Sequence, residues 1–140
     1  MKITKPLYLV IFILIIEINS NLLTAMETLV KTWFEKWNKG EFYYLPITEN
    51  FKHTSPFGTI HGKKDYLKLV KDNKDKFLGY QFKLHDGIYE KERACVRYTA
   101  IQGDFTLDVS EWYYAKNGLI EEIIAYYHIG EIREERQLRE

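Results

Sequence analysis

Glu111 is the residue whose type and setting in this sequence point most directly to acid–base chemistry. It lies in the segment 105–113, whose alternation is typical of a strand with one apolar face. The other odd positions of this segment are Phe105, Leu107, Val109 and Tyr113. Burial raises the pKa of an unpaired carboxyl group toward neutrality, which suits a general acid or base. The alternative is a structural salt bridge, for instance to Arg97 on the neighbouring strand.

Two histidines, His53 and His128, are the other candidate proton carriers. His53 shares one face of a short predicted strand, residues 51–55, with Phe51, so we expect its imidazole to point inward. A pair formed by His53 and Glu111 would enolise a carbonyl compound or activate water. The alternative is a core histidine with satisfied hydrogen bonds. His128 shares one face of the predicted strand 119–129 with Ile124 and Tyr126, but the other face of that strand is equally apolar, so alternation does not decide whether His128 faces the interior.

Aromatic side chains form the predicted wall of a ligand pocket. The sequence contains 11 tyrosines, 8 phenylalanines and 3 tryptophans. A buried tyrosine needs a partner for its hydroxyl, so this excess favours an interior with a polar-lined hollow, and strand propensity is the simpler alternative. Tyr98, Tyr113 and Tyr126 are candidate hydroxyl donors to a carbonyl oxygen or oxyanion. Phe51 and Trp33 are candidate apolar contacts, with ordinary core packing as the alternative.

Composition and motifs argue against several other classes of function. The 20 basic residues balance the 20 acidic ones, which disfavours an extended nucleic-acid surface. Cys95 is the only cysteine, so an intrachain disulfide and a zinc site with several thiolates are excluded. No two histidines have metal-ligand spacing on one element, and glycine-rich phosphate or dinucleotide loops are absent. We therefore predict no metal, no cofactor and no nucleic-acid partner.

The elements that must position these residues are two helices and a series of strands. Apolar residues recur with helical spacing from Met26 to Trp37, and Gly40 ends this predicted helix. Residues 41–45 favour one further helical turn, and residues 63–77 a second helix. Four longer strands are expected at 80–89, 94–101, 105–115 and 119–129. Their turns predict an antiparallel meander, with Asn117-Gly118 suited to a tight hairpin and Asp86-Gly87 to a bulge or an earlier turn.

The order of these elements predicts an α+β fold in which helices cover one face of a curved sheet. Three motifs then resemble the SnoaL-like proteins of the nuclear transport factor 2-like superfamily. They are Phe51-Lys52-His53-Thr54-Ser55-Pro56, Gly62 with Tyr66, and the stretch from Glu111 through Asn117-Gly118-Leu119-Ile120 to Tyr126-Tyr127. The resemblance covers residues 26–130.

The resemblance implies a cone-shaped, strongly curved antiparallel sheet wrapped by the N-terminal helices, a cystatin-like α+β barrel with a pocket at its wide end. Such domains often form homodimers. Members include ketosteroid isomerases, polyketide cyclases, limonene-epoxide hydrolases and dehydratases, and also proteins without catalysis, so the fold implies no single reaction. SnoaL-type cyclases carry an aspartate base just after the terminal aromatic pair, where this chain has His128. The Asp-Arg-Asp set of the epoxide hydrolases has no counterpart here.

The first 25 residues differ in kind from the rest. Lys2 and Lys5 precede the apolar run 7–16, and a polar stretch leads to Ala25, a pattern typical of a secretory signal peptide. Three alternatives stay open: an uncleaved membrane anchor, a true start at Met26, and an ordinary helix. We therefore predict a leader at 1–25, the SnoaL-like domain at 26–130 and a charged tail at 131–140. A cleaved leader implies a secreted or periplasmic protein, and a start at Met26 a cytoplasmic one.

Two hypotheses for function follow. In the first, the domain binds a small, largely apolar organic molecule in its cone, with cofactor-free acid–base chemistry of the isomerase, cyclase or hydratase type. Glu111 with His53 or His128 would then carry protons. In the second, the domain is a non-catalytic ligand carrier or a dimerising interaction module. A membrane would be contacted only through an uncleaved leader.

Overall fold

The structure is a computed structural model that describes residues 5–138. Residues 1–4 of the predicted leader and 139–140 of the predicted tail lie outside the described residues. The α-helices are α1 (Lys5–Asn38), α2 (Lys63–Asp72) and α3 (Lys74–Phe77). The strands are β1 (Ile47–Ser55), β2 (Gly58–His61), β3 (Gln81–Tyr89), β4 (Arg93–Gln102), β5 (Phe105–Lys116) and β6 (Leu119–Tyr126). Three short 3-10 turns are η1 (Phe42–Tyr44), η2 (Ile129–Glu131) and η3 (Glu134–Arg136).

The six strands form one curved sheet in the order β2-β1-β6-β5-β4-β3. Strands β3 to β6 make the predicted antiparallel meander, and β1 joins it by pairing in parallel with β6. Asn117 and Gly118 both have positive φ, at 52° and 77°, as a type I′ turn between β5 and β6 requires. The register of β3 shifts between Leu84 and Asp86, which places a bulge at His85. The expected α+β fold is confirmed.

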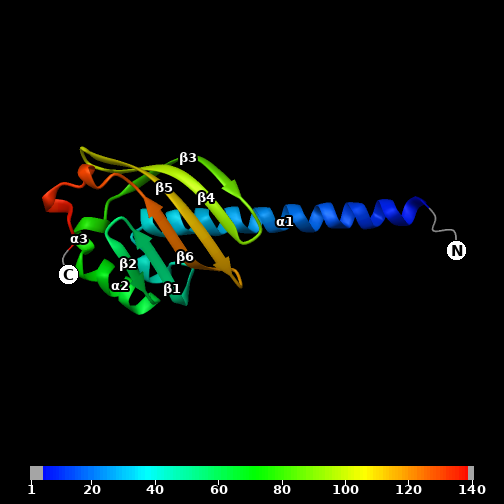
Figure 1. Cartoon of the computed structure of the whole chain (residues 1–140), viewed down its shortest axis with the longest axis horizontal. Helices are drawn as coiled ribbons and strands as arrows, with labels where there is room; N and C mark the ends of the chain where they lie inside the picture. Colours follow the sequence, from blue (N-terminus) through cyan, green and yellow to red (C-terminus); the bar gives the residue numbers. More distant parts are fainter. Residues whose placement is uncertain (1–4, 139–140) are drawn as a thin grey trace.

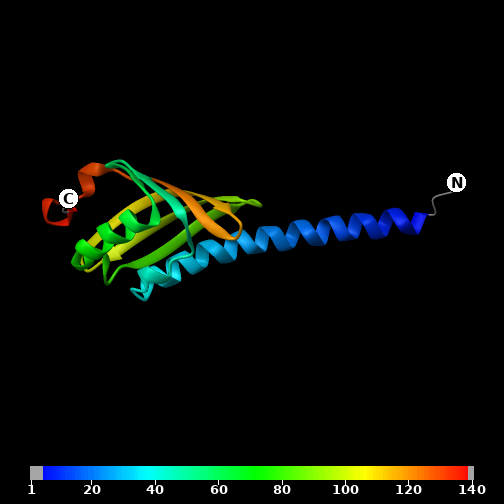
Figure 2. The same ribbon diagram turned by 90° about the horizontal axis from the view of Figure 1, so that it is seen from below.

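The helices cover the concave side of this sheet (Figures 1 and 2). The second half of α1 packs on β3 and β4, and α2 packs on β1 and β2. The helix face predicted between Met26 and Trp37 is buried in the core. Gly40 has a positive φ of 70° just after α1, where a side chain would be strained, and this explains why the helix ends there. The interior of the domain therefore lies between two helices and one sheet.

Two predicted elements differ from the observed ones. The helix expected at 63–77 is interrupted at Asn73, which is fully buried and whose Nδ2 donates to the Leu69 carbonyl at 3.0 Å. This side-chain bond to the backbone favours an end to the helix at that point. The strand expected to reach residue 129 ends at Tyr126, and η2 follows. The backbone therefore leaves the sheet before His128.

Helix α1 continues without a break from Lys5 into the domain and extends well beyond the sheet (Figure 1). Ile11, Ile13, Leu14, Ile15 and Ile16 are about half exposed along this extension. Ala25 is exposed, and Met26 beside it is 2% exposed. Among residues 5–138, no helix combines the length and hydropathy needed to span a bilayer.

Candidate functional site

A cavity of about 670 Å³ lies between the concave face of the sheet and the helices. Its apolar wall includes Trp33 and Phe34 of α1 and Leu107 and Val109 of β5. The ionisable and hydroxyl groups that line it include His53 and Ser55 of β1, Tyr66 of α2, Tyr98 of β4 and Glu111 of β5. A largely apolar hollow with a few convergent polar groups is the usual form of a small-molecule site.

Glu111 is the buried carboxylate of this cavity. Alternation in β5 turns it inward with Val109 and Tyr113, and its residue is only 4% exposed. The Tyr113 hydroxyl donates a hydrogen bond to Glu111 Oε2, and the Tyr98 hydroxyl supplies a second. Burial raises the pKa of Glu111 from 4.5 to about 7, although both hydrogen bonds oppose the rise. Glu111 is therefore poised to gain or lose a proton near neutral pH.

The alternative salt bridge between Glu111 and Arg97 is not formed. The Arg97 side chain lies on the outer face of the sheet and pairs with Asp86 at 3.2 Å. Strand alternation places residue 97 on the face opposite to Val96 and Tyr98, which are buried. The carboxylate of Glu111 thus has tyrosine hydroxyls as partners, which leave it free to titrate.

Three tyrosines surround this carboxyl group and stay protonated. Burial and the nearby Glu111 charge raise the pKa values of Tyr66, Tyr98 and Tyr113 well above 10. Their hydroxyls therefore remain hydrogen-bond donors at any physiological pH. Phe34 packs edge-on against Tyr98, with ring centroids 4.9 Å apart, which fixes one of these donors in place.

His53 lies on the same cavity wall as Tyr66. Their ring centroids are 5.4 Å apart, and the Glu111 charge contributes to raising the pKa of Tyr66. Burial lowers the pKa of His53 from 6.5 to about 4. The imidazole is therefore neutral at pH 7, and it can donate from one ring nitrogen and accept at the other.

The other predicted site residues fall in different places. Trp33 lines the cavity, and Phe51 is fully buried beneath it, 6.1 Å from Trp33 between ring centroids. Tyr113 is fully buried and reaches the site through Glu111. Tyr126 is 58% exposed, His128 is exposed, and neither lines the cavity. The structure thus brings Glu111, His53, Tyr98, Tyr113, Phe51 and Trp33 together and leaves Tyr126 and His128 outside.

The undecided face of β6 is settled by its burial pattern. Ile123 and Ala125 are buried, Tyr126 is exposed, and Tyr127 lines the cavity just beyond the strand. The Tyr127 hydroxyl hydrogen-bonds Ser55, and the nearby Glu111 charge contributes to raising its pKa. Sequence reasoning gave no role in the site to Tyr66, Tyr127 or Ser55. Ser55 lies two positions after His53 on the same inward face of its strand, and this alternation could have identified Ser55 from the sequence.

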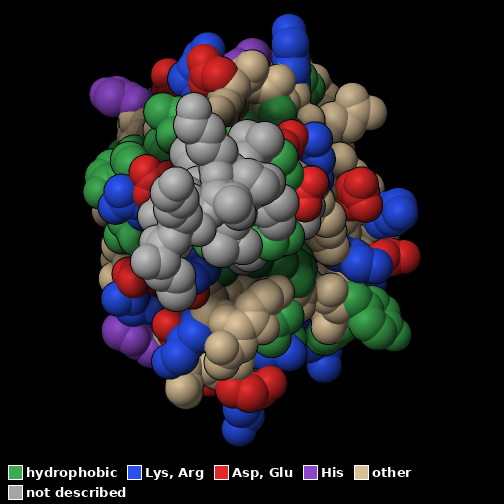
Figure 3. All heavy atoms as spheres, turned by 90° about the vertical axis from the view of Figure 1, so that its right-hand side faces the viewer, with side chains coloured by type: hydrophobic (Ala, Val, Ile, Leu, Met, Phe, Trp, Pro, Cys, Tyr) green, Lys and Arg blue, Asp and Glu red, His purple; other side chains and the backbone are tan. Residues whose placement is uncertain are grey.

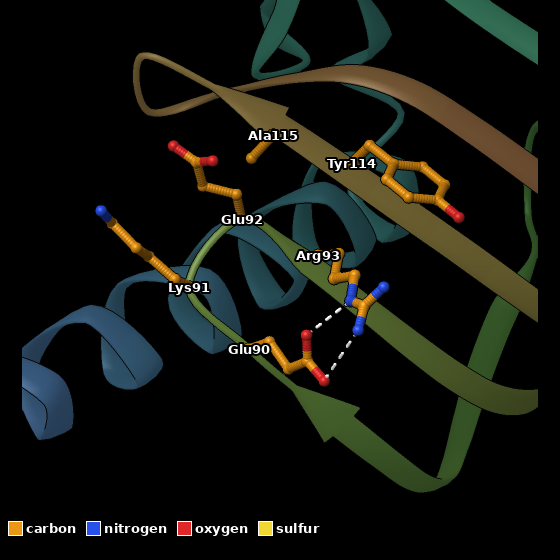
Figure 4. Close-up of a pocket in the computed structure, with 6 residues that line it drawn as sticks. All are labelled: Glu90, Lys91, Glu92, Arg93, Tyr114 and Ala115. Atoms are coloured by element: carbon orange, nitrogen blue, oxygen red, sulfur yellow. Dashed lines mark hydrogen bonds and ion pairs between the residues drawn. The ribbon is translucent and has the colours of Figure 1, made fainter.

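A second, smaller hollow of about 400 Å³ lies at the turn between β3 and β4 (Figure 4). Its walls are mostly exposed charged side chains, and Arg93 is already paired with Glu90 at 2.5 Å. Solvated groups with ordinary partners offer no perturbed chemistry. The larger, mostly apolar cavity beside Glu111 is therefore the candidate site.

Within residues 5–138, no group of three histidine, cysteine, aspartate or glutamate side chains is placed to hold a metal ion. Figure 3 views the molecule from the N-terminal end of α1, and basic and acidic side chains alternate around that face. No single sign of charge dominates it.

Comparisons with known proteins place the fold. No family model matches the chain, and no curated protein sequence matches it. A protein from Kribbella flavida proposed to be a ketosteroid isomerase is 17% identical, with a TM-score of 0.66 over 76% of this chain and 79% of its own. A SnoaL-like protein of unknown function from Burkholderia thailandensis is 13% identical, with a TM-score of 0.65 over 75% of this chain and 95% of its own.

A third similar structure is a Xanthomonas campestris protein proposed to be a polyketide cyclase. It is 17% identical, with a TM-score of 0.63 over 79% of this chain and 95% of its own. At such identities the likeness concerns the fold. The resemblance seen in the sequence is thus confirmed for the fold: the chain has the cone-shaped architecture of SnoaL-like proteins.

Proposed function

We propose that this domain binds a small, largely apolar organic molecule in the cavity and moves a proton on it with Glu111. The observation that carries the proposal is a carboxyl group with a pKa of about 7, buried in an apolar cavity and bonded by two tyrosine hydroxyls. Keeping a carboxyl group away from water costs free energy, and functional sites are where proteins most often bear that cost.

The cavity wall supports an apolar ligand. Its apolar lining includes Trp33, Phe34, Phe82, Leu107 and Val109. Each apolar Å² that the ligand removes from water contributes about 25 cal/mol to binding. Ser55, Tyr66 and Tyr127 lie among them and would orient polar atoms of the ligand.

The proposed reaction is an enolisation without a cofactor. The ionised Glu111 carboxylate accepts a proton from the carbon next to a carbonyl group, and the C–H electron pair becomes the enolate double bond. The carbonyl oxygen takes the negative charge and accepts a hydrogen bond from the hydroxyl of Tyr66, which lines the cavity and is not one of the two donors to Glu111. In a β,γ-unsaturated ketone the enolate is conjugated with the second double bond, so return of the proton to the γ-carbon shifts that double bond and completes an isomerisation; neutral His53 is available to relay the proton.

Solvent deuterium exchange tests this proposal without knowledge of the natural substrate. We expect the protein to speed incorporation of deuterium into 2-tetralone, an apolar bicyclic ketone, followed by mass spectrometry. Glu111→Gln should remove the acceleration. Glu121→Gln, in an exposed ion pair with Lys116, should keep it. Equal exchange by wild type and Glu111→Gln would contradict proton transfer by Glu111.

Ligand binding is tested separately, because a carrier would bind without turnover. The uncharged dye N-phenyl-1-naphthylamine fluoresces when it enters an apolar pocket. Ala100 lines the cavity, so Ala100→Phe should fill part of it and weaken dye binding. Ala115→Phe places the same side chain outside the cavity and serves as control. Tight dye binding with no deuterium exchange would support the carrier hypothesis instead.

We also propose that the protein is a homodimer joined through the outer face of the sheet. Ile88, Cys95, Trp112 and Ile124 are paired in register across β3, β4, β5 and β6, which makes an apolar row on that face. Ile88 is 72% exposed and Trp112 38%. Trp112→Glu should therefore produce a monomer by native mass spectrometry, and Thr106→Glu, outside the row on β5, should not. A wild-type monomer would contradict the proposal.

For the N-terminal segment we propose a leader that is removed on export. Ala25 is exposed and Met26 is buried, and this change supports a domain boundary between them. A chain from Met26 to Glu140 should therefore melt at the temperature of the full chain. Intact-mass measurement of protein from its source gives the mature start. A mass that includes residues 1–25 would overturn removal, and an initiator Met26 would indicate the cytoplasmic alternative.

A further inference from the structure

The C-terminal segment, residues 129–138, follows β6 and lies at the end of the domain away from the N-terminal extension of α1 (Figure 2). Ile132, Arg136, Gln137 and Leu138 of this segment line it. Lys76 Nζ donates to the Gln137 carbonyl, which holds the end of the segment against the domain, whereas Arg133 makes only an exposed ion pair with Asp104 at 3.5 Å. A charged tail without any core pattern in its sequence thus completes the wall of the cavity.

Among the described residues, the Arg136 guanidinium contacts neutral groups and no carboxylate. Its guanidinium stacks 4.0 Å over the Phe105 ring. Nη1 donates to Gln102 Oε1 at 2.5 Å and to the Tyr80 hydroxyl at 3.3 Å, and Nη2 donates to the Gln102 carbonyl at 3.3 Å. The buried Nε has no acceptor in the described part of the chain. No carboxylate between residues 5 and 138 forms an ion pair with Arg136.

The acidic group of the cavity lies far from this guanidinium. Phe105 and Glu111 occupy the same face of β5, six positions apart, which is about 20 Å along a strand. Lys76 lines the cavity at the Arg136 end, and Glu111 is the one carboxylate among the described lining residues. One end of the cavity is therefore cationic, and the other holds a carboxyl group that is about half protonated at pH 7.

We infer that Arg136 binds an anionic group of the ligand, so the ligand is an apolar molecule that carries a carboxylate or a comparable acid. This inference rests on the proposed function, because it names the class of molecule that the cavity takes. A partly buried cation without a counter-charge gains a charge-assisted hydrogen bond from such a group. The apolar body of the ligand then extends along Phe105, Leu107 and Val109 toward Glu111.

A matched pair of dyes tests the inference. 8-Anilinonaphthalene-1-sulfonate has the ring system of N-phenyl-1-naphthylamine and adds one sulfonate. In Arg136→Gln we expect the affinity for the sulfonate dye, divided by that for the uncharged dye, to fall about tenfold from its wild-type value. Arg133→Gln removes an equal charge from the same segment but from a residue outside the cavity lining, so it should leave the ratio unchanged.

A second variant covers the case in which Arg136→Gln does not fold. Gln102→Glu supplies the missing counter-charge beside Nη1 and gives up the bond from Gln102 Nε2 to the Leu78 carbonyl. It should lower the same affinity ratio, and its melting curve reports whether the fold is intact.

The outcomes separate the two proposals. If wild type does not bind the uncharged dye, the proposed pocket fails and the inference fails with it. If the uncharged dye binds but Arg136→Gln and Gln102→Glu keep the wild-type ratio, only the inference is overturned. A fall of the ratio in Arg133→Gln as large as that in Arg136→Gln would also overturn it, because general surface charge would then account for the preference.

Discussion

The Tyr113 hydroxyl donates a hydrogen bond to the Glu111 carboxylate from two residues further along the same face of β5. The strand itself therefore carries both the acid and one of its partners. Burial of Glu111 favours the neutral form, and the tyrosine bonds favour the ionised form. The pKa of about 7 is the balance between these effects, so changing either one should move it.

Tyr113→Phe should raise the pKa of Glu111, because it removes a hydrogen bond that stabilises the ionised carboxylate. A bond of this kind is worth about one pKa unit. Carbon-13 NMR of labelled glutamate side chains, followed against pH, measures the shift directly. Tyr114→Phe is the control, since residue 114 lies on the opposite face of β5. An unchanged or lower Glu111 pKa in Tyr113→Phe would contradict this account.

Glu111→Gln should change how stability depends on pH. The folded pKa of Glu111, about 7, lies above its ordinary value of 4.5, so the folded state binds the extra proton between those limits. Glu111 thus makes the protein lose about 3 kcal/mol of stability as pH rises from 4.5 to 7. Glu111→Gln removes this loss, and urea unfolding at several pH values measures it. A wild-type pH profile in the variant would count against a raised pKa.

His53→Gln should show the opposite effect. The folded pKa of His53, about 4, lies below 6.5, so the unfolded state binds the extra proton and stability rises with pH between those values. In wild type, this rise largely offsets the fall due to Glu111. His53→Gln should therefore expose a fall in unfolding free energy between pH 4.5 and 7, whereas Glu111→Gln should expose a rise between pH 4 and 6.5. If the unfolding free energies of both variants changed with pH in the same direction, the opposite pKa shifts of Glu111 and His53 would be refuted.

Phe51→Ala should destabilise the fold strongly. Phe51 is fully buried and packs against Trp33 and Tyr66, with ring centroids 6.1 Å and 4.9 Å away. Replacing a buried phenylalanine by alanine costs about 3–5 kcal/mol because a cavity remains. Phe57→Ala is the matched control, since Phe57 is 58% exposed and should cost about 0.5 kcal/mol. Urea denaturation of both variants gives the comparison, and equal losses would show that Phe51 is not a core residue.

Local patterns predicted most of the secondary structure, because they depend on neighbours within a few residues. The helical spacing from Met26 to Trp37 marks the face of α1 that is buried. Alternation in 105–113 placed Glu111 on the apolar face of β5, and Asn117-Gly118 marked the turn before β6. Local patterns did not predict the exact ends of the helices and strands. The break at the buried Asn73 and the exit of the chain from the sheet after Tyr126 depend on distant contacts.

The sequence by itself determined that one carboxylate would stand among apolar side chains, because alternation along a strand is a property of the backbone. Only the tertiary structure decided its partners. The register of β4 against β5 brings Tyr98 to Glu111, and the packing of α2 brings Tyr66 against His53. Arg136 hydrogen-bonds Gln102, which lies 34 residues earlier in the chain, although the tail that carries Arg136 has no periodic pattern of hydrophobic residues. Such contacts depend on how the sheet curves and closes, which no local pattern records.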